Sequence, residues 1–320
     1  MLVIHIGSPK TGTTAIQGVL KSNADALAAR NCRFVQAGRT NIAHNSMVKP
    51  LLKGRADDTL LAIRDEIARH PGDVHILSSE VFFQPAAAPL LADGLAGIGV
   101  PIKVVAYLRR PDQYAEAMYK QKVKNGRIDP DPDRFLAGFQ PQLSYGQTLD
   151  AYGAAFGEDA MSVRPFERRY LKDDDVVADF LDQAGGGGIK GLTKPETPSN
   201  KTLSRAVSEH LGRVNRWTDF NTRVMIREIA AAGVPDTIRS GDVYDKAARQ
   251  GIRVATRADQ AAIAKTYFAD LADPFDWSDL SETAPDPYPG AEETLRLERA
   301  ASDAVIAAIG RQAADRAATS

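Results

Sequence analysis

The sequence predicts an α/β fold in which helices cover both faces of a central parallel sheet. Four short apolar runs have the length and composition of buried strands, namely residues 2–6, 74–78, 102–108 and 161–166. A segment with apolar residues at helical spacing follows each run. Strands that alternate with helices in this way form parallel sheets, because each right-handed crossover brings the chain back to the same edge.

Three helices are predicted between and after these strands. The first begins near Thr13 and extends past Lys21. The second covers residues 86–96 and ends at Gly97 and Gly99, because glycine terminates helices. The third covers 173–183 and ends at the glycine run 185–188, which we expect to act as a flexible connector. The apolar spacing that defines the first helix is carried by Ile16, Val19, Leu20 and Leu27.

Beyond residue 195 only helical patterns remain. An apolar stripe predicts one helix with Thr202 as its N-cap and with Trp217 in the core. Residues 36–56, 127–145 and 219–260 are predicted as variable loops, which would define substrate specificity. A proline-rich turn then precedes an alanine-rich helix near 291–315. The apolar stripe consists of Leu203, Val207, Leu211 and Val214, and the prolines are Pro285, Pro287 and Pro289.

Composition excludes several classes of protein. The 320 residues have a net charge of −1, from 40 basic and 41 acidic side chains, so no bulk attraction to nucleic acid or an anionic membrane is expected. Cys32 has no second cysteine to pair with, which favours a reducing compartment. No apolar run approaches the roughly 20 residues of a transmembrane helix, and no basic leader precedes the first strand. We expect a cytoplasmic protein.

Three unusual segments follow three of the predicted strands. They are residues 7–14, 78–80 and 109–110. Since the carboxyl ends of parallel strands lie along one edge, these segments are expected to meet there, and ligands of such sheets bind beyond that edge.

The first of these segments has the features of a phosphate-binding loop. A strand ends at Gly7 and a helix opens near Thr13, so several backbone amides and the helix dipole are available to a phosphate. Gly12 allows close backbone approach, and Lys10 can place its ammonium over the phosphates. A nucleotide triphosphatase loop, G-x-x-x-x-G-K-[ST], would have lysine where Thr13 stands. A kinase that uses ATP remains an alternative, with Glu80 as its metal ligand.

These motifs resemble those of a known family. The run from Pro9 to Thr14 is similar to the P-K-[ST]-G-T-T loop of the P-loop sulfotransferases, bacterial ones included, which use 3′-phosphoadenosine 5′-phosphosulfate (PAPS). Arg109-Arg110-Pro111 resembles their 3′-phosphate motif, and Arg164-Pro165-Phe166-Glu167 resembles their strand near the adenine. The resemblance covers roughly residues 1–215 and implies a three-layer P-loop NTPase-like sandwich with a helical C-terminal part. The donor-binding residues that it implies are Pro9, Lys10, Thr11, Gly12, Thr13, Thr14, Arg109 and Phe166.

The resemblance also implies the catalytic residues. Glu80 directly follows a strand, as does the glutamate base of carbohydrate sulfotransferases, and Lys10 would stabilise the leaving phosphate oxygen. No metal is required in this mechanism. The acceptor would be a small-molecule or saccharide hydroxyl or amine, with a carbohydrate or glycolipid favoured by Glu80.

One position departs from the family pattern. Ala117 stands where the family has a serine that binds the 3′-phosphate. The loss of this hydroxyl is expected to lower the affinity for the donor, unless Tyr119 or Lys120 supplies a replacement hydrogen bond. This departure keeps open a non-catalytic nucleotide-binding module of the same fold. Lys201 has two interpretations: it belongs to the family's late basic loop, or it is a solvated lysine near the start of a helix.

Several further polar residues have two interpretations each. His44 either contacts the acceptor or has a structural role, whereas His5 and His75 are expected in the core. Three basic side chains either line a cleft for an anionic acceptor or lie on a solvated helix face, namely Lys122, Lys124 and Arg127. The predicted organisation is a sulfotransferase domain over 1–280, with a helical acceptor-side region over 196–280, followed by a turn and helix over 281–320.

Overall fold

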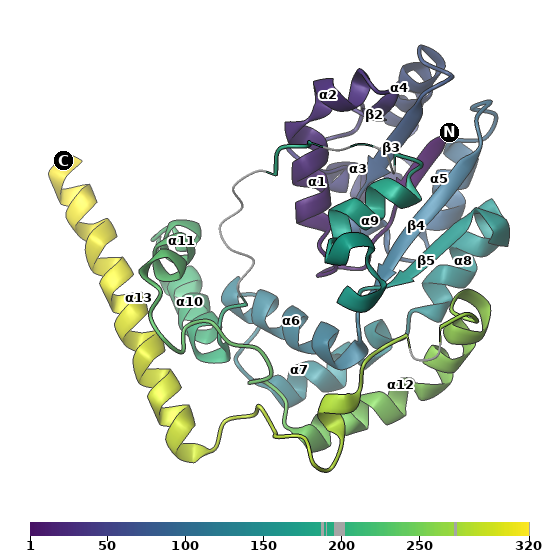
Figure 1. Ribbon diagram of the computed structural model, residues 1–320. Helices are drawn as coiled ribbons and strands as arrows, with labels where there is room; N and C mark the ends of the chain where they lie inside the picture. Colours follow the sequence, from purple (N-terminus) through teal and green to yellow (C-terminus); the bar gives the residue numbers. More distant parts are fainter. Residues whose placement is uncertain (187–188, 190, 195–201, 272–273, 320) are drawn as a thin grey trace. The chain divides into compact units, whose positions relative to one another are not determined.

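The computed structural model describes residues 1–186, 189, 191–194, 202–271 and 274–319, which form two compact units (Figure 1). Unit 1 comprises Met1–Arg110, Ser144–Glu196 and Ala258–Asp276, and unit 2 comprises Pro111–Leu143, Thr197–Arg257 and Trp277–Ser320. Each unit is therefore assembled from three separate stretches of the chain. The predicted boundary at residue 280 lies near one of the breaks, and the division into domains stays a prediction.

Unit 1 contains a five-stranded parallel sheet in the order β2-β3-β1-β4-β5. The strands are β1 (Leu2–His5), β2 (Cys32–Phe34), β3 (Val74–Ser78), β4 (Ile102–Leu108) and β5 (Met161–Pro165). The four predicted strands are confirmed. The sequence analysis missed β2, which has three residues and too few apolar positions for a pattern.

Both faces of this sheet are buried, as the alternation of side chains along a strand requires. Val3, Ile76 and Val105 belong to a core cluster that includes side chains of α1 (Thr13–Ser22) and α9 (Val176–Gln183). Their neighbours Ile4 and Leu77 point to the opposite face and are equally buried. The predicted α/β fold with helices on both faces of a parallel sheet is confirmed (Figure 1).

The other helices of unit 1 connect these strands. They are α2 (Ala24–Ala28), α3 (Asn45–Leu51), α4 (Asp57–Ala68), α5 (Ala87–Gly94) and α8 (Gly146–Phe156), with short 3₁₀ turns η1 (Glu80–Phe82), η3 (Glu158–Ala160), η4 (Arg168–Tyr170) and η5 (Lys172–Asp174). The predicted start of α9 at Asp173 is wrong. Asp173 and Asp174 have left-handed φ values of 53° and 55°, and the helix begins after Asp175, whose carboxylate accepts hydrogen bonds from the first amides.

Unit 2 is helical. It contains α6 (Pro111–Lys124), α7 (Pro132–Phe139), η2 (Gln140–Leu143), α10 (Arg205–Trp217), α11 (Thr222–Ala232), η6 (Ser278–Leu280) and α13 (Ala291–Thr319). The division between the units falls within α12 (Lys246–Tyr267). Among the described residues, no helix is long and apolar enough to cross a membrane.

The prediction of loops over 36–56, 127–145 and 219–260 is wrong, because each of them contains helix. The helix α11 shows why: it buries Met225 and Ile229 against α10 and α13, and this tertiary contact outweighs its weak sequence pattern.

The helix α10 confirms its predicted apolar stripe but not its ends. Leu203, Val207 and Leu211 are buried in a cluster with α11 and α13. Ser204, not Thr202, is the N-cap, and its hydroxyl accepts from the amide of Val207. Trp217 is 78% exposed and therefore not a core residue, because the buried stripe ends one turn earlier.

Unit 2 also contains a close contact between α6 and α10. A Cβ atom on Gly212 would lie 2.1 Å from the carbonyl oxygen of Val123. The two backbones can approach this closely only because residue 212 has no side chain.

We expect Gly212→Ala to destabilise the protein by about 1–3 kcal/mol, although alanine is the better helix former. The matched control is Gly310→Ala in α13, where a Cβ would meet no atom within 4 Å. That change should raise stability by about 0.5–1 kcal/mol. Urea denaturation of the three proteins measures both effects, and equal stabilisation by the two substitutions would contradict the close contact.

Candidate functional site

The candidate phosphate loop leaves β1 at Gly7 and is anchored to the neighbouring strand. The amide and the hydroxyl of Ser8 both donate to the carbonyl of Tyr107 in β4, over 3.3 and 3.0 Å. The hydroxyl of Thr11 donates to the carbonyl of Ser8 over 2.6 Å. Two left-handed residues, Lys10 at φ 71° and Gly12 at φ 78°, turn the chain into α1. The loop is thus fixed by its own hydroxyl groups and by the strand beside it.

The amides at the start of α1 are available to a ligand. Within α1, the first backbone amides that donate a hydrogen bond are those of Ala15 and Ile16, and both donate to the carbonyl of Gly12. In the part of the chain that the structure describes, the amides of Thr13 and Thr14 donate to no acceptor. Together with the positive end of the helix dipole, they form a site for an anion.

Gly12 is required in this loop for two reasons. Its positive φ is unfavourable for residues with a side chain, and a Cβ there would lie 2.8 Å from a methyl group of Val176 and 3.5 Å from the ring of Phe166. Phe166, predicted near the donor, therefore lies against the loop. Its amide donates to the carbonyl of Leu108, which places it at the carboxyl end of β4.

Glu80 reaches the same loop from the end of β3. The Thr13 hydroxyl donates to Oε2 of Glu80 over 3.1 Å, and this hydrogen bond orients a half-buried carboxylate beside the anion site. The backbone before it is also fixed. Ser79 accepts from the amide of Val81 and donates to Asn45 in α3.

Arg109 reaches the loop from the end of β4. Its Nη1 donates to the carbonyl of Lys10 over 3.1 Å, so the guanidinium lies beside the loop. The backbone carbonyl of Arg109 accepts from the hydroxyl of Tyr145 over 2.7 Å. The Tyr145 side chain is fully buried, and its ring meets that of Phe83 edge to face. No pattern in the sequence pointed to Tyr145, because it is distant along the chain and was predicted to lie in a loop.

The predicted convergence of three segments at one edge of the sheet is therefore confirmed as geometry. Two hydrogen bonds within unit 1 join these segments: Thr13 donates to Glu80, and Arg109 donates to the carbonyl of Lys10. The roles assigned to these side chains, and to Pro9, Thr11 and Thr14, stay predictions.

The residues around Phe166 have mainly structural partners. Arg164 pairs with the buried Asp179, which also accepts from the hydroxyl of Tyr107. Burial raises the pKa of Glu167, while the nearby positive charge of Arg110 opposes that rise. Of this segment, Phe166 is the residue that reaches the phosphate loop.

His44 has the structural role, which is one of the two alternatives that the sequence left open. Its side chain is 0% exposed. The Nδ1 atom accepts from the amide of Ser78 over 3.2 Å, and Nε2 donates to the carbonyl of Val35 over 3.1 Å. Burial lowers the pKa of His44 to about 4, so the ring is neutral. It fastens the end of β3 from which Glu80 extends.

His5 and His75 are core residues, as predicted. Nδ1 of His5 lies 2.8 Å from the hydroxyl of Ser78, which also accepts from the side-chain amide of Gln17. This buried chain joins β1, β3 and α1 directly below the phosphate loop. Burial lowers the pKa of His5 to about 3.

Other candidate residues lie in unit 2 or outside the described residues. Ala117 is buried in α6. Compensation by its neighbours stays a prediction, and in the structure Tyr119 donates to Glu209 while Lys120 pairs with Glu116 and Asp242. Lys201 lies outside the described residues.

Comparisons with known proteins give limited matches. No protein-family model matches the sequence. An uncharacterized protein of Archaeoglobus fulgidus is 30% identical over 113 residues, which are 35% of this chain and only 30% of that protein. Among solved structures, the chain is similar to a sulfotransferase from Alicyclobacillus acidocaldarius, with a TM-score of 0.36 and 19% identity over 62% of this chain and 86% of that one. These matches do not assign an activity to the chain.

The two neutral histidines predict a pH dependence of stability. Their pKa values of about 3 and about 4 in the folded protein are below the unfolded value of 6.5, so the unfolded chain binds more protons between these limits. The free energy of unfolding should therefore fall as the pH drops below about 6.5, by up to about 1.4 kcal/mol per pH unit for each histidine. Urea denaturation at pH 7, 6 and 5 measures this slope.

The control is His44→Gln, which keeps one acceptor and one donor but does not titrate. Its slope near pH 5 should be smaller by about 1.4 kcal/mol per pH unit. A variant with the same slope as the parent protein would show that His44 is already protonated in the folded state.

Proposed function

We propose that this chain is a sulfotransferase that moves the sulfuryl group of PAPS to a hydroxyl or amine of an acceptor. The observation that carries the proposal is that both neighbouring strand ends bond to the same loop, Glu80 through the Thr13 hydroxyl and Arg109 through the carbonyl of Lys10. It combines an anion-binding loop, a carboxylate base and two cations at one edge of the sheet. The resemblance of the loop to P-K-[ST]-G-T-T supports the choice of donor.

The donor would bind through its two phosphate ends. The 5′-phosphosulfate would accept hydrogen bonds from the amides of Thr13 and Thr14, with the exposed ammonium of Lys10 as counter-charge. Arg109 would bind the 3′-phosphate, and the ring of Phe166 would lie along the adenine. Pro9 and Thr11 would hold the loop in shape rather than contact the donor, because the Thr11 hydroxyl is engaged with Ser8.

In the chemical step, the acceptor oxygen or nitrogen would attack sulfur in line with the leaving phosphate oxygen. As the new bond to sulfur forms, Glu80 would take the acceptor's proton, and the bond between sulfur and the 5′-phosphate oxygen would break. Its electron pair would remain on adenosine 3′,5′-bisphosphate, where the ammonium of Lys10 and the loop amides would stabilise the charge. These groups are in place before the charge develops, which is the condition for strong transition-state stabilisation.

The acceptor class that we favour is a saccharide or glycolipid hydroxyl. The reason is the identity of the base. A glutamate at this strand end resembles the arrangement of the carbohydrate sulfotransferases, and His44, the alternative base, has both ring nitrogens engaged in the core. No step of this proposed reaction requires a metal ion.

A second candidate is a non-catalytic module that binds the nucleotide without turnover. The observation that favours it is Ala117, because the serine hydroxyl is missing there and the neighbouring Tyr119 and Lys120 have other partners. Measurement of sulfuryl transfer with a radiolabelled donor and a panel of saccharides separates the two candidates.

We expect adenosine 3′,5′-bisphosphate, without added metal, to stabilise the protein more than Mg²⁺–ATP does. The amides of Thr13 and Thr14 with Lys10 serve one phosphate group, and Arg109 serves the other. At 100 times its dissociation constant, the ligand adds about 2.7 kcal/mol, which corresponds to a rise in melting temperature of about 4 °C for a chain of 320 residues. Equal stabilisation by Mg²⁺–ATP would favour the kinase alternative instead.

The matched control for this experiment is Arg109→Ala with two ligands. This substitution should weaken the bisphosphate far more than adenosine 5′-phosphosulfate, which has no 3′-phosphate. Equal losses would mean that Arg109 acts only through the shape of the Lys10 loop.

We expect Glu80→Gln to separate chemistry from binding. Glutamine can still accept the Thr13 hydroxyl group's hydrogen bond but cannot take the acceptor's proton. Turnover should fall by about 10²–10⁴, with donor affinity changed only a few-fold. The control is Glu158→Gln, whose carboxylate precedes β5 at the opposite edge of the sheet and should leave turnover unchanged. Normal turnover by Glu80→Gln would remove Glu80 from the mechanism.

A further inference from the structure

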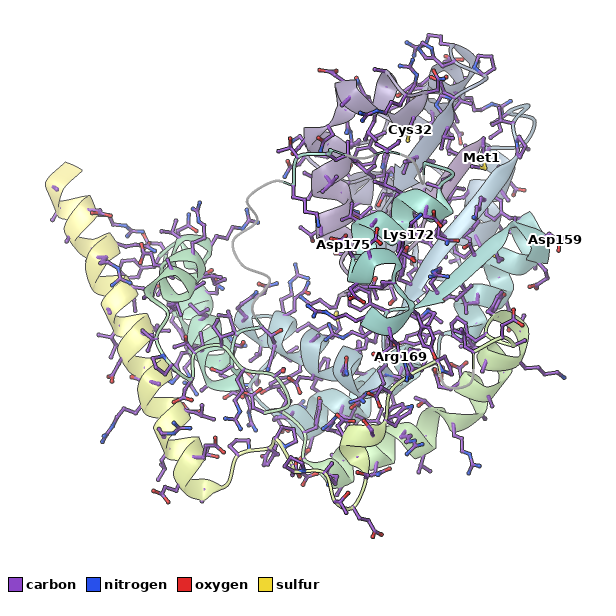
Figure 2. All side chains as sticks on the ribbon, in the orientation of Figure 1. Met1, Cys32, Asp159, Arg169, Lys172 and Asp175 are labelled. Carbon is purple, nitrogen blue, oxygen red and sulfur yellow. The ribbon has the colours of Figure 1, made fainter. Side chains whose placement is uncertain are left out.

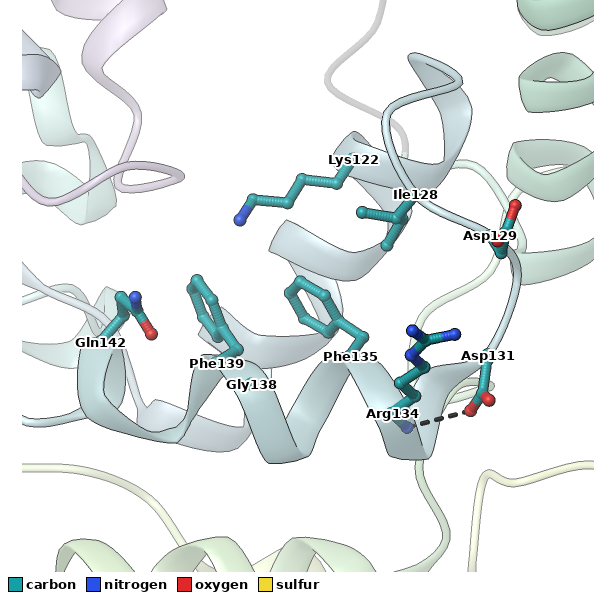
Figure 3. A pocket seen from close by; sticks show the side chains of 9 residues that line it. All are labelled: Lys122, Ile128, Asp129, Asp131, Arg134, Phe135, Gly138, Phe139 and Gln142. Atoms are coloured by element: carbon teal, nitrogen blue, oxygen red, sulfur yellow. Dashed lines mark hydrogen bonds between the residues drawn. The ribbon is translucent and has the colours of Figure 1, made fainter.

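A pocket in unit 2 lies between α6 and the segment around α7 (Figure 3). Its volume is about 380 Å³, within the range of small-molecule sites. All of its lining residues belong to one stretch of unit 2, from Lys122 to Gln142, so the pocket is defined without reference to the phosphate loop.

The floor of this pocket is aromatic. Phe135 and Phe139, one helical turn apart on α7, stack with their ring centroids 4.9 Å apart and their planes at 22°. Figure 3 shows both rings pointing from α7 toward Lys122 and Ile128. The side chain of Ile128 adds an apolar wall. Such a surface fits a flat apolar body.

The pocket is lined by two cations, Lys122 and Arg134, and two carboxylates, Asp129 and Asp131. The ammonium of Lys122 lies 5.5 Å from the ring centre of Phe135 and 5.2 Å from that of Phe139. Arg134 contributes a second, exposed guanidinium to the lining. Among the described residues, neither cation lies within ion-pair distance of a carboxylate. The pKa of Asp129 is lowered mainly by its hydrogen bond to Arg216 and, to a smaller extent, by the charge of Arg134.

The two carboxylates of the lining already have partners. Asp129 forms an ion pair with Arg216 of α10. Asp131 is the N-cap of α7 and accepts from the amide of Arg134 over 2.9 Å. An anionic ligand would therefore meet two cations that form no ion pair with the carboxylates of the lining.

Gly138 is one of the lining residues of the pocket. It lies within α7 between the two phenylalanines, and a Cβ there would meet no atom within 4 Å. Glycine is unfavourable in a helix, and here neither packing nor a positive φ requires it. A larger side chain at this lining position therefore has room to extend without a clash.

We propose that this pocket binds a flat apolar molecule that carries one anionic group, such as an aryl sulfonate, sulfate or carboxylate. The apolar body lies on Phe135 and Phe139, and the anion is held by Lys122 and Arg134. A bare anion lacks the aromatic contact, and a neutral aromatic compound leaves both cations unpaired. The site binds its ligand whether or not the chain transfers sulfuryl groups.

The test is isothermal titration calorimetry without nucleotide, using naphthalene-2-sulfonate as the probe. We expect one site per chain with a dissociation constant below about 1 mM. Its neutral isostere naphthalene-2-sulfonamide should bind at least about 10-fold more weakly, and methanesulfonate should show no saturable binding, because each lacks one of the two interactions. Equal affinity for the sulfonate and the sulfonamide would overturn the proposal, as would no binding of the sulfonate.

Variants locate the site. Gly138→Leu fills the pocket and should abolish binding without loss of thermal stability, whereas Gly138→Ala, which adds one methyl group, should weaken binding at most about 3-fold. Lys122→Met keeps the aliphatic stem over the rings and should weaken the sulfonate about 10-fold but leave the sulfonamide unchanged. Lys53→Met, at an exposed lysine of unit 1, is the control for general charge and should have no effect. If Gly138→Leu and Lys122→Met both bind naphthalene-2-sulfonate like the parent protein, the pocket is not the site.

Discussion

The position of β1 at the centre of the sheet is the constraint on which the candidate site depends. β1 pairs with β3 on one side and with β4 on the other, so its carboxyl end lies between the ends of those strands. The register matches His5 with Ser78 and with Val105, only a few residues before Glu80 and Arg109. The loop that follows β1 is therefore flanked by a carboxylate and a guanidinium. A shift of one residue in either pairing would move these groups and also turn each core side chain to the other face.

Buried polar groups hold this edge in place. The side chains of His5, Gln17 and Ser78 form one hydrogen-bonded chain under the phosphate loop. His44 accepts from the backbone amide of Ser78. Figure 2 shows the side chains of the described residues on the ribbon. Both histidines stay neutral, because burial lowers their pKa values. A charged imidazolium here would lack the water that stabilises it. The rigidity that positions Glu80 thus has a cost in stability at acidic pH.

In unit 2, α6 has two sets of interactions on different faces. Lys120 forms a buried group with Glu116 and Asp242, and the amide of Gly241 also donates to Glu116. Removal of one member of such a group leaves a buried charge without compensation, which is strongly destabilising. Lys122, two residues further along, contributes instead to the aromatic pocket with Phe135 and Phe139. Neighbouring lysines of one helix therefore differ in role according to the face on which they lie.

The sequence by itself determined the α/β class, four of the five strands, and the meeting of the Lys10 loop with Glu80 and Arg109. Local patterns sufficed for these features, because strand burial, glycine positions and the geometry of parallel sheets are set by residues close together in the chain. It did not determine the role of His44, the exposure of Trp217 or the support of Arg109 by Tyr145.

Tertiary structure decided these points. Each of them depends on partners that are distant in the sequence. The partners of His44 are the backbone groups of Ser78 and Val35, which any residue at those positions would supply, so no side-chain pattern records them. The helix α11 is likewise stabilised by the buried side chains that it packs against α10 and α13. The pocket around Gly138 exists only because α6 and α7 lie together, and packing of this kind has no signature in a single sequence.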